Sequence, residues 1–535
     1  MGGISTESRI SGERPRFPLA AAAAGAVALL AALLVASREL GSLGGDNAEY
    51  CLLARSIREG LGYRSAWAPG EAPLHTLYPP VFPLLLVPFI GSAPVNFLAA
   101  HLPVAAAAGA AVFLLALLFE RRGLPPWAAA AAALVPALSL YWLRCAADLL
   151  SELPFLAFVA GALLALEPGG DGTERLPPRR IAAAATCAVL AYLTRTAGLA
   201  LAIPVAAALV LDRRCRGRAG WIGACAVAAS VLGWTFYTSA AGGGGGYLDQ
   251  LGGGADGSVS ILPERAFRDL AENYIPRTRN YLAAPVLPVW ITWSGTLAWG
   301  LAAAVVVVGL LRRRTLAAAE AFFVLYLAMQ CAWPFQDSRF ALPLAALLAP
   351  FAVEMAHLLL VRFSPAPTRS LAATAFAVVL ILPNAWIFTA LILPRLHRPR
   401  PAAIPGSHEP ASFTETWPWT DDQYRQAAHA QVAFLHACDL VREGGIPGLP
   451  EGPVMAGNPR VAALFTGRRA VQPPKGGTPD AVAARAREAG VVAVVVPDFG
   501  DPYAEALRGW RDARRGDLDL LLALPGGVEV FRVRR

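Results

Sequence analysis

Ionisable side chains that could do chemistry are concentrated in short segments that border long apolar runs. Residues 44–50 read Gly-Gly-Asp-Asn-Ala-Glu-Tyr and place carboxylates at Asp46 and Glu49. A second segment, residues 144–154, holds Asp148 and Glu152 at an i, i+4 spacing, which puts both on one face if the segment is helical. A carboxylate in such a place could act as a general base toward a hydroxyl or an amine.

A structural role accounts for the first segment equally well. Asp46 followed three residues later by Glu49 is the pattern of a capping box, and Gly60 is a typical helix stop. Apolar residues between 50 and 57 recur at helical spacing, so we expect a short amphipathic helix lying at a membrane interface. The two roles are compatible, because an N-cap carboxylate is held rigidly and can still face a cleft.

Basic side chains near the same borders are candidates for binding an anion. Arg195 has apolar residues on both sides, and a charge in that setting should face protein or a polar cavity. Arg339 begins a later apolar run, where a salt bridge to Asp337 is the alternative explanation. His75 lies in a proline-dense segment and could bind phosphate or simply be exposed, while Arg144 opens the second acidic segment.

The elements that position these groups must be membrane helices. Of the 535 residues, 56% are hydrophobic and 16% are charged, and the mean hydropathy is +0.48. Soluble domains are roughly 45–50% apolar and about 25% charged, so intrinsic disorder and an ordinary soluble enzyme are both excluded. The runs that could cross a hydrocarbon core of ~30 Å are 18–36, 95–119, 127–142, 152–166, 181–211, 219–240, 284–311, 316–332, 340–361 and 371–393. Because Arg195 interrupts the run 181–211, we divide it into two short spans, which gives eleven in all.

The arginines predict the orientation of these spans. The chain carries a formal net charge of +8, and every loop that is internal when the N-terminus is inside contains arginine, as the positive-inside rule requires. The basic excess therefore orients helices, and a nucleic-acid partner is excluded. The first run lacks a small-residue cleavage site and is interpreted as an uncleaved anchor. The seven scattered cysteines indicate neither a disulfide framework nor a zinc site, and a bridge between Cys51 and Cys145 is left open.

The composition changes after the last apolar run, and we expect two domains: a membrane domain, 1–393, and a small α/β domain, 394–535. In the second domain, periodicity predicts helices at 421–443, 479–488 and 502–515 and strands at 491–496, 518–524 and 528–533. An odd number of spans places this domain on the outer side. The sequence thus predicts a polytopic α-helical protein of the cell membrane with an extracytoplasmic C-terminal α/β domain.

Taken together and in this order, the polar segments resemble the polyprenyl-phosphate-dependent glycosyltransferases of the GT-C fold. The group that they resemble is glycosyltransferase family 39, which contains the protein O-mannosyltransferases and the bacterial aminoarabinose transferases. The pattern spans residues 18–393. The matching segments are Gly45-Asp46-Asn47-Ala48-Glu49-Tyr50, Tyr78-Pro79-Pro80, Ser151-Glu152-Leu153-Pro154-Phe155, Thr194-Arg195 with Gly198-Leu199, and Ser338-Arg339-Phe340 with Pro343.

The resemblance implies that a sugar passes from a polyprenyl-phosphate-linked donor to a lipid, glycan or protein acceptor on the outer face of the membrane, with inversion at the anomeric carbon. It implies catalytic roles for Asp46 and Glu152, with Asp46 as the general base or the carboxylate that orients the acceptor. A departing phosphate needs cationic stabilisation, for which Arg195 and Arg339 are the first candidates. The remaining substrate-binding candidates are Glu49, His75, Tyr78, Arg144 and Asp148.

Two positions depart from the family pattern. Asn47 stands where the family often has a second acid, which weakens the argument for a metal site, so a divalent metal is left open and no other cofactor is indicated. Leu77 stands where many members have lysine, which leaves phosphate binding to other groups. The expected partners are the lipid-linked donor, membrane lipid and an acceptor.

The principal alternative is a multi-span lipid or glycolipid transporter, or flippase, without transferase activity. Transporters place ionisable or broken-helix sites near the bilayer midplane. In this sequence the span centres are nearly free of charge, and polar groups gather at the outer border instead. That distribution favours chemistry at the outer surface.

Overall fold

The computed structural model describes residues 18–36, 45–68, 70–91, 95–168, 174–242, 300, 304, 318–332, 338–363, 365–386, 388–389, 422–497 and 502–534. The predicted span 284–311 lies outside these ranges apart from two isolated residues. Asp337 and the predicted domain boundary at 393 also lie outside the described residues.

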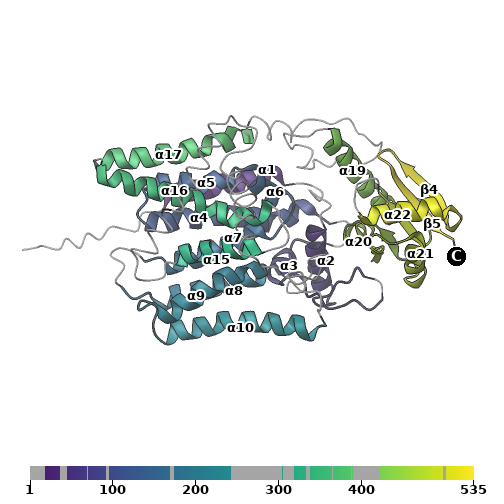
Figure 1. Ribbon diagram of the computed structural model, residues 1–535, viewed down its shortest axis with the longest axis horizontal. Helices are drawn as coiled ribbons and strands as arrows, with labels where there is room; N and C mark the ends of the chain where they lie inside the picture. Colours follow the sequence, from purple (N-terminus) through teal and green to yellow (C-terminus); the bar gives the residue numbers. More distant parts are fainter. Residues whose placement is uncertain are drawn as a thin grey trace, which may run out of the picture.

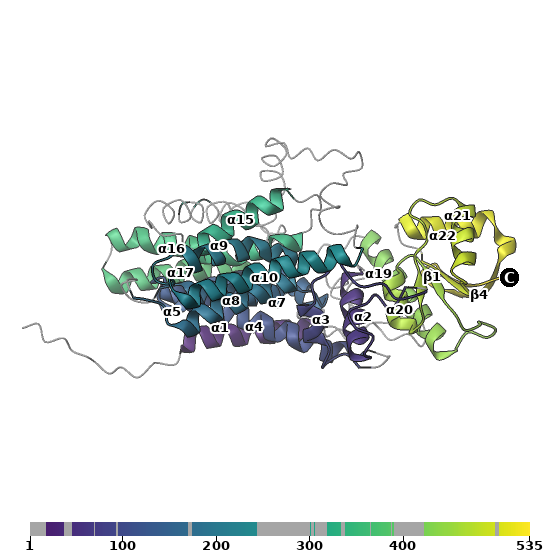
Figure 2. The same ribbon diagram turned by 90° about the horizontal axis from the view of Figure 1, so that it is seen from below.

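Long apolar helices run alongside one another and form one body of the molecule (Figures 1 and 2). They are α1 (Leu19–Val35), α4 (Phe97–Arg121), α5 (Pro126–Ala137), α7 (Glu152–Leu166), α8 (Pro178–Thr194), α9 (Leu199–Leu211), α10 (Arg218–Ala240), α15 (Ala318–Ala332), α16 (Leu342–Phe363) and α17 (Ala366–Trp386). Each predicted span except 284–311 therefore contains a helix in the described structure. Among the described residues, α4, α10, α16 and α17 are by themselves long and apolar enough to cross a membrane. The total of eleven spans stays a prediction.

Small residues allow close packing of these helices. Gly25 on α1 faces Gly109 on α4, and a Cβ atom built on either glycine would lie 2.9 Å from the carbonyl oxygen of the other. Such close backbone approach is typical of helix pairs in membranes, where no hydrophobic force drives helices together.

The predicted span 127–142 and the acidic segment after it are interrupted. Helices α5 and α6 (Leu140–Ala147) meet at an angle of 67°. Asp148 caps the end of α6, Leu149 has a positive φ of 53°, and α7 begins at Glu152. The expectation that Asp148 and Glu152 share one helix face is therefore wrong, because the left-handed residue between them ends the first helix. A non-glycine residue in that region is strained and often marks a functional segment.

The first polar segment also differs from its prediction. Helix α2 (Asp46–Arg58) begins at Asp46 after Gly45, which has a φ of 87°, and no side chain caps its start. The predicted capping box is wrong, since both carboxylates contact other parts of the chain. Most of α2 is buried and packs against α3 (Val81–Leu86) and α20 (Pro459–Thr466), and its predicted position at a membrane interface stays a prediction. Gly60 follows the helix with a φ of 77°, which confirms it as the stop.

The C-terminal part folds around a five-stranded mixed sheet of order β2-β1-β3-β5-β4 (Figure 1). Its strands are β1 (Val454–Ala456), β2 (Ala470–Val471), β3 (Ala493–Val496), β4 (Leu518–Leu524) and β5 (Val528–Val533). Its helices are α19 (Asp422–Glu443), α20 (Pro459–Thr466), α21 (Pro479–Glu488) and α22 (Pro502–Ala513). Strands β2, β1 and β3 pair in parallel, while β5 pairs antiparallel with both β3 and β4. The helices and strands predicted here are present.

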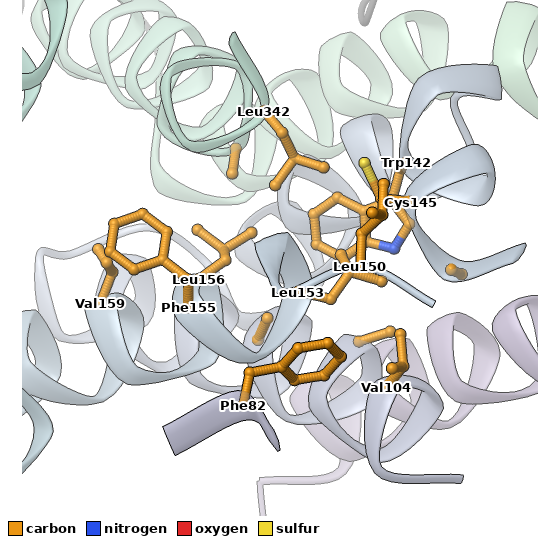
Figure 3. Packing of buried hydrophobic residues seen from close by; sticks show 14 of the residues in the cluster. Phe82, Val104, Trp142, Cys145, Leu150, Leu153, Phe155, Leu156, Val159 and Leu342 are labelled. Carbon is orange, nitrogen blue, oxygen red and sulfur yellow. The ribbon is translucent and has the colours of Figure 1, made fainter. Parts of the chain in front are cut away.

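A buried apolar cluster fixes the elements from which the candidate site is built (Figure 3). Phe82 from α3, Trp142 from α6, Phe155 from α7 and Leu342 from α16 are all fully buried members of it. Because packed aromatic side chains tolerate little displacement, this cluster holds α3, the start of α7 and the start of α16 in fixed relation.

A buried ionic cluster lies where α4 ends. Arg122 is buried and contacts Glu320 at 2.6 Å, Glu354 at 3.0 Å and Glu167 at 3.5 Å. These residues come from α15, α16 and the end of α7, so the cluster ties four helices together.

Candidate active site

Four charged residues from distant parts of the chain form a continuous ion-pair series. Arg339 Nη2 lies 2.7 Å from Asp46 Oδ2, and its Nε lies 3.7 Å from Glu152 Oε1. Arg195 Nη1 lies 2.5 Å from the same oxygen of Glu152. The structure therefore brings together both predicted catalytic carboxylates and both predicted phosphate-binding arginines.

Phe340 lies against both arginines, and Ser151 contacts Arg195. The guanidinium carbons of Arg195 and Arg339 lie 5.5 Å and 5.1 Å from the centre of the Phe340 ring. At this distance an aromatic ring attracts a cation. Arg195 also donates to the Ser151 hydroxyl at 3.1 Å, and this hydroxyl lies 3.1 Å from that of Tyr50. The Phe340 ring thus lies against two guanidinium groups, each of which is already paired with a carboxylate.

The local backbone explains how Arg195 reaches this place. Helix α8 ends at Thr194, Arg195 is extended, and a short 3-10 turn (Thr196–Gly198) precedes α9. A Cβ at Gly198 would lie 2.6 Å from the Cα of Tyr192, so only glycine fits there. This break between α8 and α9 places the Arg195 side chain, which is 16% exposed, beside Glu152.

Asp46 is held as a carboxylate by its neighbours. Burial would raise the pKa of Asp46, but the charge of Arg339 and hydrogen bonds from Tyr78 and Arg339 outweigh it and leave that pKa below its ordinary value of 3.8. The Tyr78 hydroxyl donates to Asp46 Oδ1 at 2.5 Å. Burial and the adjacent carboxylate together raise the pKa of Tyr78 well above 10. Tyr78 is therefore a hydrogen-bond donor and Asp46 an acceptor.

Glu49 and His75 form a second layer behind Asp46. The buried carboxylate of Glu49 lies 3.2 Å from His75 Nδ1 and accepts from Ser65 at 3.1 Å. His75 Nε2 accepts the backbone N–H of Tyr78 at 3.0 Å. Because one ring nitrogen accepts, the other carries the proton, so His75 is in this geometry a neutral link between Glu49 and Tyr78. Its predicted role in phosphate binding stays a prediction.

Arg144 and Asp148 pair with each other at the end of α6, 3.2 Å apart. They lie on an element adjacent to η3 (Ser338–Ala341), which carries Arg339. In the described part of the chain, no group of three histidine, cysteine or acidic residues is arranged to hold a metal ion.

Sequence reasoning missed Arg460, which belongs to α20 in the C-terminal part. Its Nε lies 3.1 Å from Glu49 Oε2. The segment Asn458-Pro459-Arg460 has the composition of a helix start, and the Asn458 side chain does cap α20. Nothing in that local pattern indicates a partner in the first polar segment.

The fold is similar to that of several solved protein structures. No protein-family model matches the sequence, and no curated protein is significantly similar to it. Among solved structures, ArnT from Cupriavidus metallidurans in the apo state has a TM-score of 0.54 and 14% identity, covering 95% of this chain and 97% of that chain. The same protein bound to undecaprenyl phosphate has a TM-score of 0.52 and 14% identity, covering 96% and 97%. The oligosaccharyltransferase AglB from Archaeoglobus fulgidus, in complex with an inhibitory peptide and a dolichol-phosphate, has a TM-score of 0.51 and 13% identity, covering 89% and 69%. The chain therefore has the GT-C fold that its polar segments predict.

Proposed function

We propose that this protein is an integral-membrane glycosyltransferase that moves a sugar from a polyprenyl-phosphate-linked donor to a lipid, glycan or protein acceptor. The observation that carries the proposal is the series Asp46–Arg339–Glu152–Arg195, which joins a base and two cations at one end of the bundle. The GT-C fold adds support, since structures with that fold have been determined with undecaprenyl phosphate or dolichol-phosphate bound.

The carboxylates and arginines divide the chemistry between them. The acceptor hydroxyl or amine attacks the anomeric carbon, and Asp46 takes up its proton. The bond from that carbon to the phosphate oxygen breaks, and its electron pair goes to the departing polyprenyl phosphate. A single displacement of this kind inverts the anomeric carbon. Arg195 and Arg339 stabilise the negative charge that develops on the phosphate.

The ion pair between Arg339 and Asp46 gives the donor a role in activating the base. A phosphate anion that binds Arg339 competes with Asp46 for the same guanidinium. The carboxylate then keeps its hydrogen bond from Tyr78 and is released toward the acceptor. Glu152, whose side chain is only 2% exposed, stays between the two arginines and fixes their spacing.

The contacts between the two parts of the chain support a proposal for the location of the candidate site. Helix α2, which carries Asp46, packs against α20, so the candidate site and the C-terminal domain lie at the same end of the bundle (Figure 2). We place this end on the extracytoplasmic side of the cell membrane, because the arginine-rich loops of the sequence fall at the other end. The domain division 1–393 and 394–535 belongs to the same proposal.

The test uses purified full-length protein in proteoliposomes with labelled polyprenyl-phosphate sugars and a panel of lipid, glycan and peptide acceptors. We expect transfer by the wild type and a loss of roughly 10²- to 10⁴-fold in Asp46→Asn, the usual contribution of a general base. Asp480→Asn, an exposed acid on α21, is the matched control and should behave as wild type. Transfer unaffected by Asp46→Asn would remove the assigned role. Vectorial lipid movement without any transfer would favour the transporter.

A further inference from the structure

The C-terminal domain docks on the segment that carries Asp46 through contacts of three kinds. Arg460 pairs with Glu49. The backbone N–H of Ala470 at the start of β2 donates to the carbonyl of Trp67 at 2.9 Å. Phe465 stacks on Phe97 at the start of α4, with ring centres 5.6 Å apart and planes 21° apart. An ion pair, a backbone hydrogen bond and an aromatic stack together fix both position and orientation.

Arg460 covers a buried carboxylate of the candidate site. Its side chain is 30% exposed, while that of Glu49 is 1% exposed, so the arginine closes over a buried carboxylate. Its charge also acts on Asp46 and Tyr78. A buried carboxylate without a cation is costly, and Arg460 supplies the cation that Glu49 faces from the C-terminal domain.

We propose that Arg460 is a positioning residue for the transfer reaction, through which the C-terminal domain sets the orientation of Asp46. This inference rests on the proposed function. The route is continuous: Arg460 holds Glu49, Glu49 holds His75, the ring of His75 accepts the backbone N–H of Tyr78, and the Tyr78 hydroxyl donates to Asp46. The C-terminal domain is in this reading a part of the active site and more than a stabilising appendage.

The charges around Asp46 allow this role to be separated from a structural one. Asp46 faces Arg339 from η3, Tyr78 from the loop before α3 and Arg460 from α20, with Glu49 on its own helix and Glu152 behind Arg339. Arg339 and Arg460 both favour the ionised carboxylate. Removing the positive charge of Arg460 should therefore raise the pKa of Asp46, whereas a residue that only holds two domains together would leave it unchanged.

The experiment compares the full-length variants Arg460→Gln and Arg460→Lys with the wild type. Arg485→Gln, which removes an exposed arginine of the same domain that pairs with Glu488, is the matched control. For Arg460→Gln we expect kcat to fall about 10- to 100-fold, the usual effect of losing a hydrogen bond to a charged group. The KM for the donor should stay unchanged, because Arg195 and Arg339 are untouched. The acid limb of the pH–rate profile should move to higher pH in Arg460→Gln and stay near that of the wild type in Arg460→Lys, which keeps the charge.

A second measurement needs no substrate. Amide hydrogen exchange should become faster in peptides that cover 46–58 and 75–86 in Arg460→Gln, and should be unchanged in Arg485→Gln. The double variant Glu49→Gln/Arg460→Gln should lose no more activity than the worse single variant, as expected for residues that act as one unit.

The outcomes separate the inference from the function on which it rests. Exchange and a pH profile in Arg460→Gln that match those of Arg485→Gln would overturn the positioning role. Faster exchange with an unmoved acid limb would also overturn it, since Arg460 would then only join the domains. A wild type that transfers no sugar would defeat the proposed function, while the exchange data would still decide whether Arg460 orders the Asp46 segment.

Discussion

Replacing Arg339 by glutamine removes a side chain that contacts both carboxylates of the ion-pair series, Asp46 and Glu152. The contact with Asp46 at 2.7 Å is a charge-assisted hydrogen bond, worth about 1.5–3 kcal/mol. If the same guanidinium stabilises the departing phosphate, its loss costs about 2.7–4 kcal/mol in the transition state. At 1.36 kcal/mol per decade, kcat/KM should fall roughly 10²- to 10³-fold.

The variant should still fold. The side chains of Asp46 and Arg339 are 23% and 24% exposed, so a carboxylate that loses its partner reaches water. Arg339→Lys keeps the charge but has no fork with which to reach two carboxylates, and about a tenfold loss is expected for it. Comparing Arg339→Lys with Arg339→Gln therefore separates the contribution of the positive charge from that of the two-contact geometry.

The assay measures release of polyprenyl phosphate from a labelled donor in a single turnover, which isolates the bond-breaking step from product release. Thermal unfolding in detergent checks that the variants are folded. A kcat/KM for Arg339→Gln equal to that of the wild type would refute the assignment. Equal losses in Arg339→Lys and Arg339→Gln would show that the two-contact geometry, rather than the charge, carries the effect.

Two further perturbations address the base and the opposite end of the bundle. In Tyr78→Phe, Asp46 loses a hydrogen bond that lowers its pKa, so the acid limb of kcat/KM should move from below 3.8 to higher pH, and an unmoved limb would contradict the assigned contact. Because the pKa of Asp46 is lowered in the folded protein, its ionised carboxylate stabilises the fold at pH values above its ordinary pKa of 3.8. This stabilisation is lost as the pH falls through the lower pKa of the folded state. Arg122→Gln breaks a buried cluster and should lower the free energy of unfolding by about 3–5 kcal/mol, measured in detergent. The exposed Arg213→Gln should change it by less than about 0.5 kcal/mol, and equal values for both variants would show that the cluster contributes nothing.

The sequence was sufficient for the long apolar helices and for most of the C-terminal elements, but helices α3 and α20 were not predicted. Apolar runs of membrane-spanning length produced a helix wherever the structure describes them, because a spanning segment must satisfy its backbone internally. The helix 479–488 and the strands 518–524 and 528–533 were predicted to the residue. Strands β1 and β2 were missed, since they have three and two residues and show no alternation.

The candidate site was predictable in most of its members, Arg460 excepted, but not in its contacts. Local pattern assigned Asp46 to a cap, whereas tertiary structure pairs it with Arg339. Local spacing put Asp148 and Glu152 on one face, which the backbone of Leu149 prevents. The role of Arg460 could not be predicted for the same reason, because its pairing with Glu49 depends on how the C-terminal domain docks.

The ion pair between Asp46 and Arg339 joins residues 293 positions apart in the chain, and this separation has a consequence for biosynthesis. At roughly 5–20 residues per second, a ribosome needs ~15–60 s to reach the arginine after it has made the aspartate. During that interval Asp46 lacks its ion-pair partner, whereas Ser65 and His75, the partners of Glu49, have already been made. The ion pair is therefore absent while the early helices enter the bilayer, and it can form only after roughly the first two-thirds of the chain has been made.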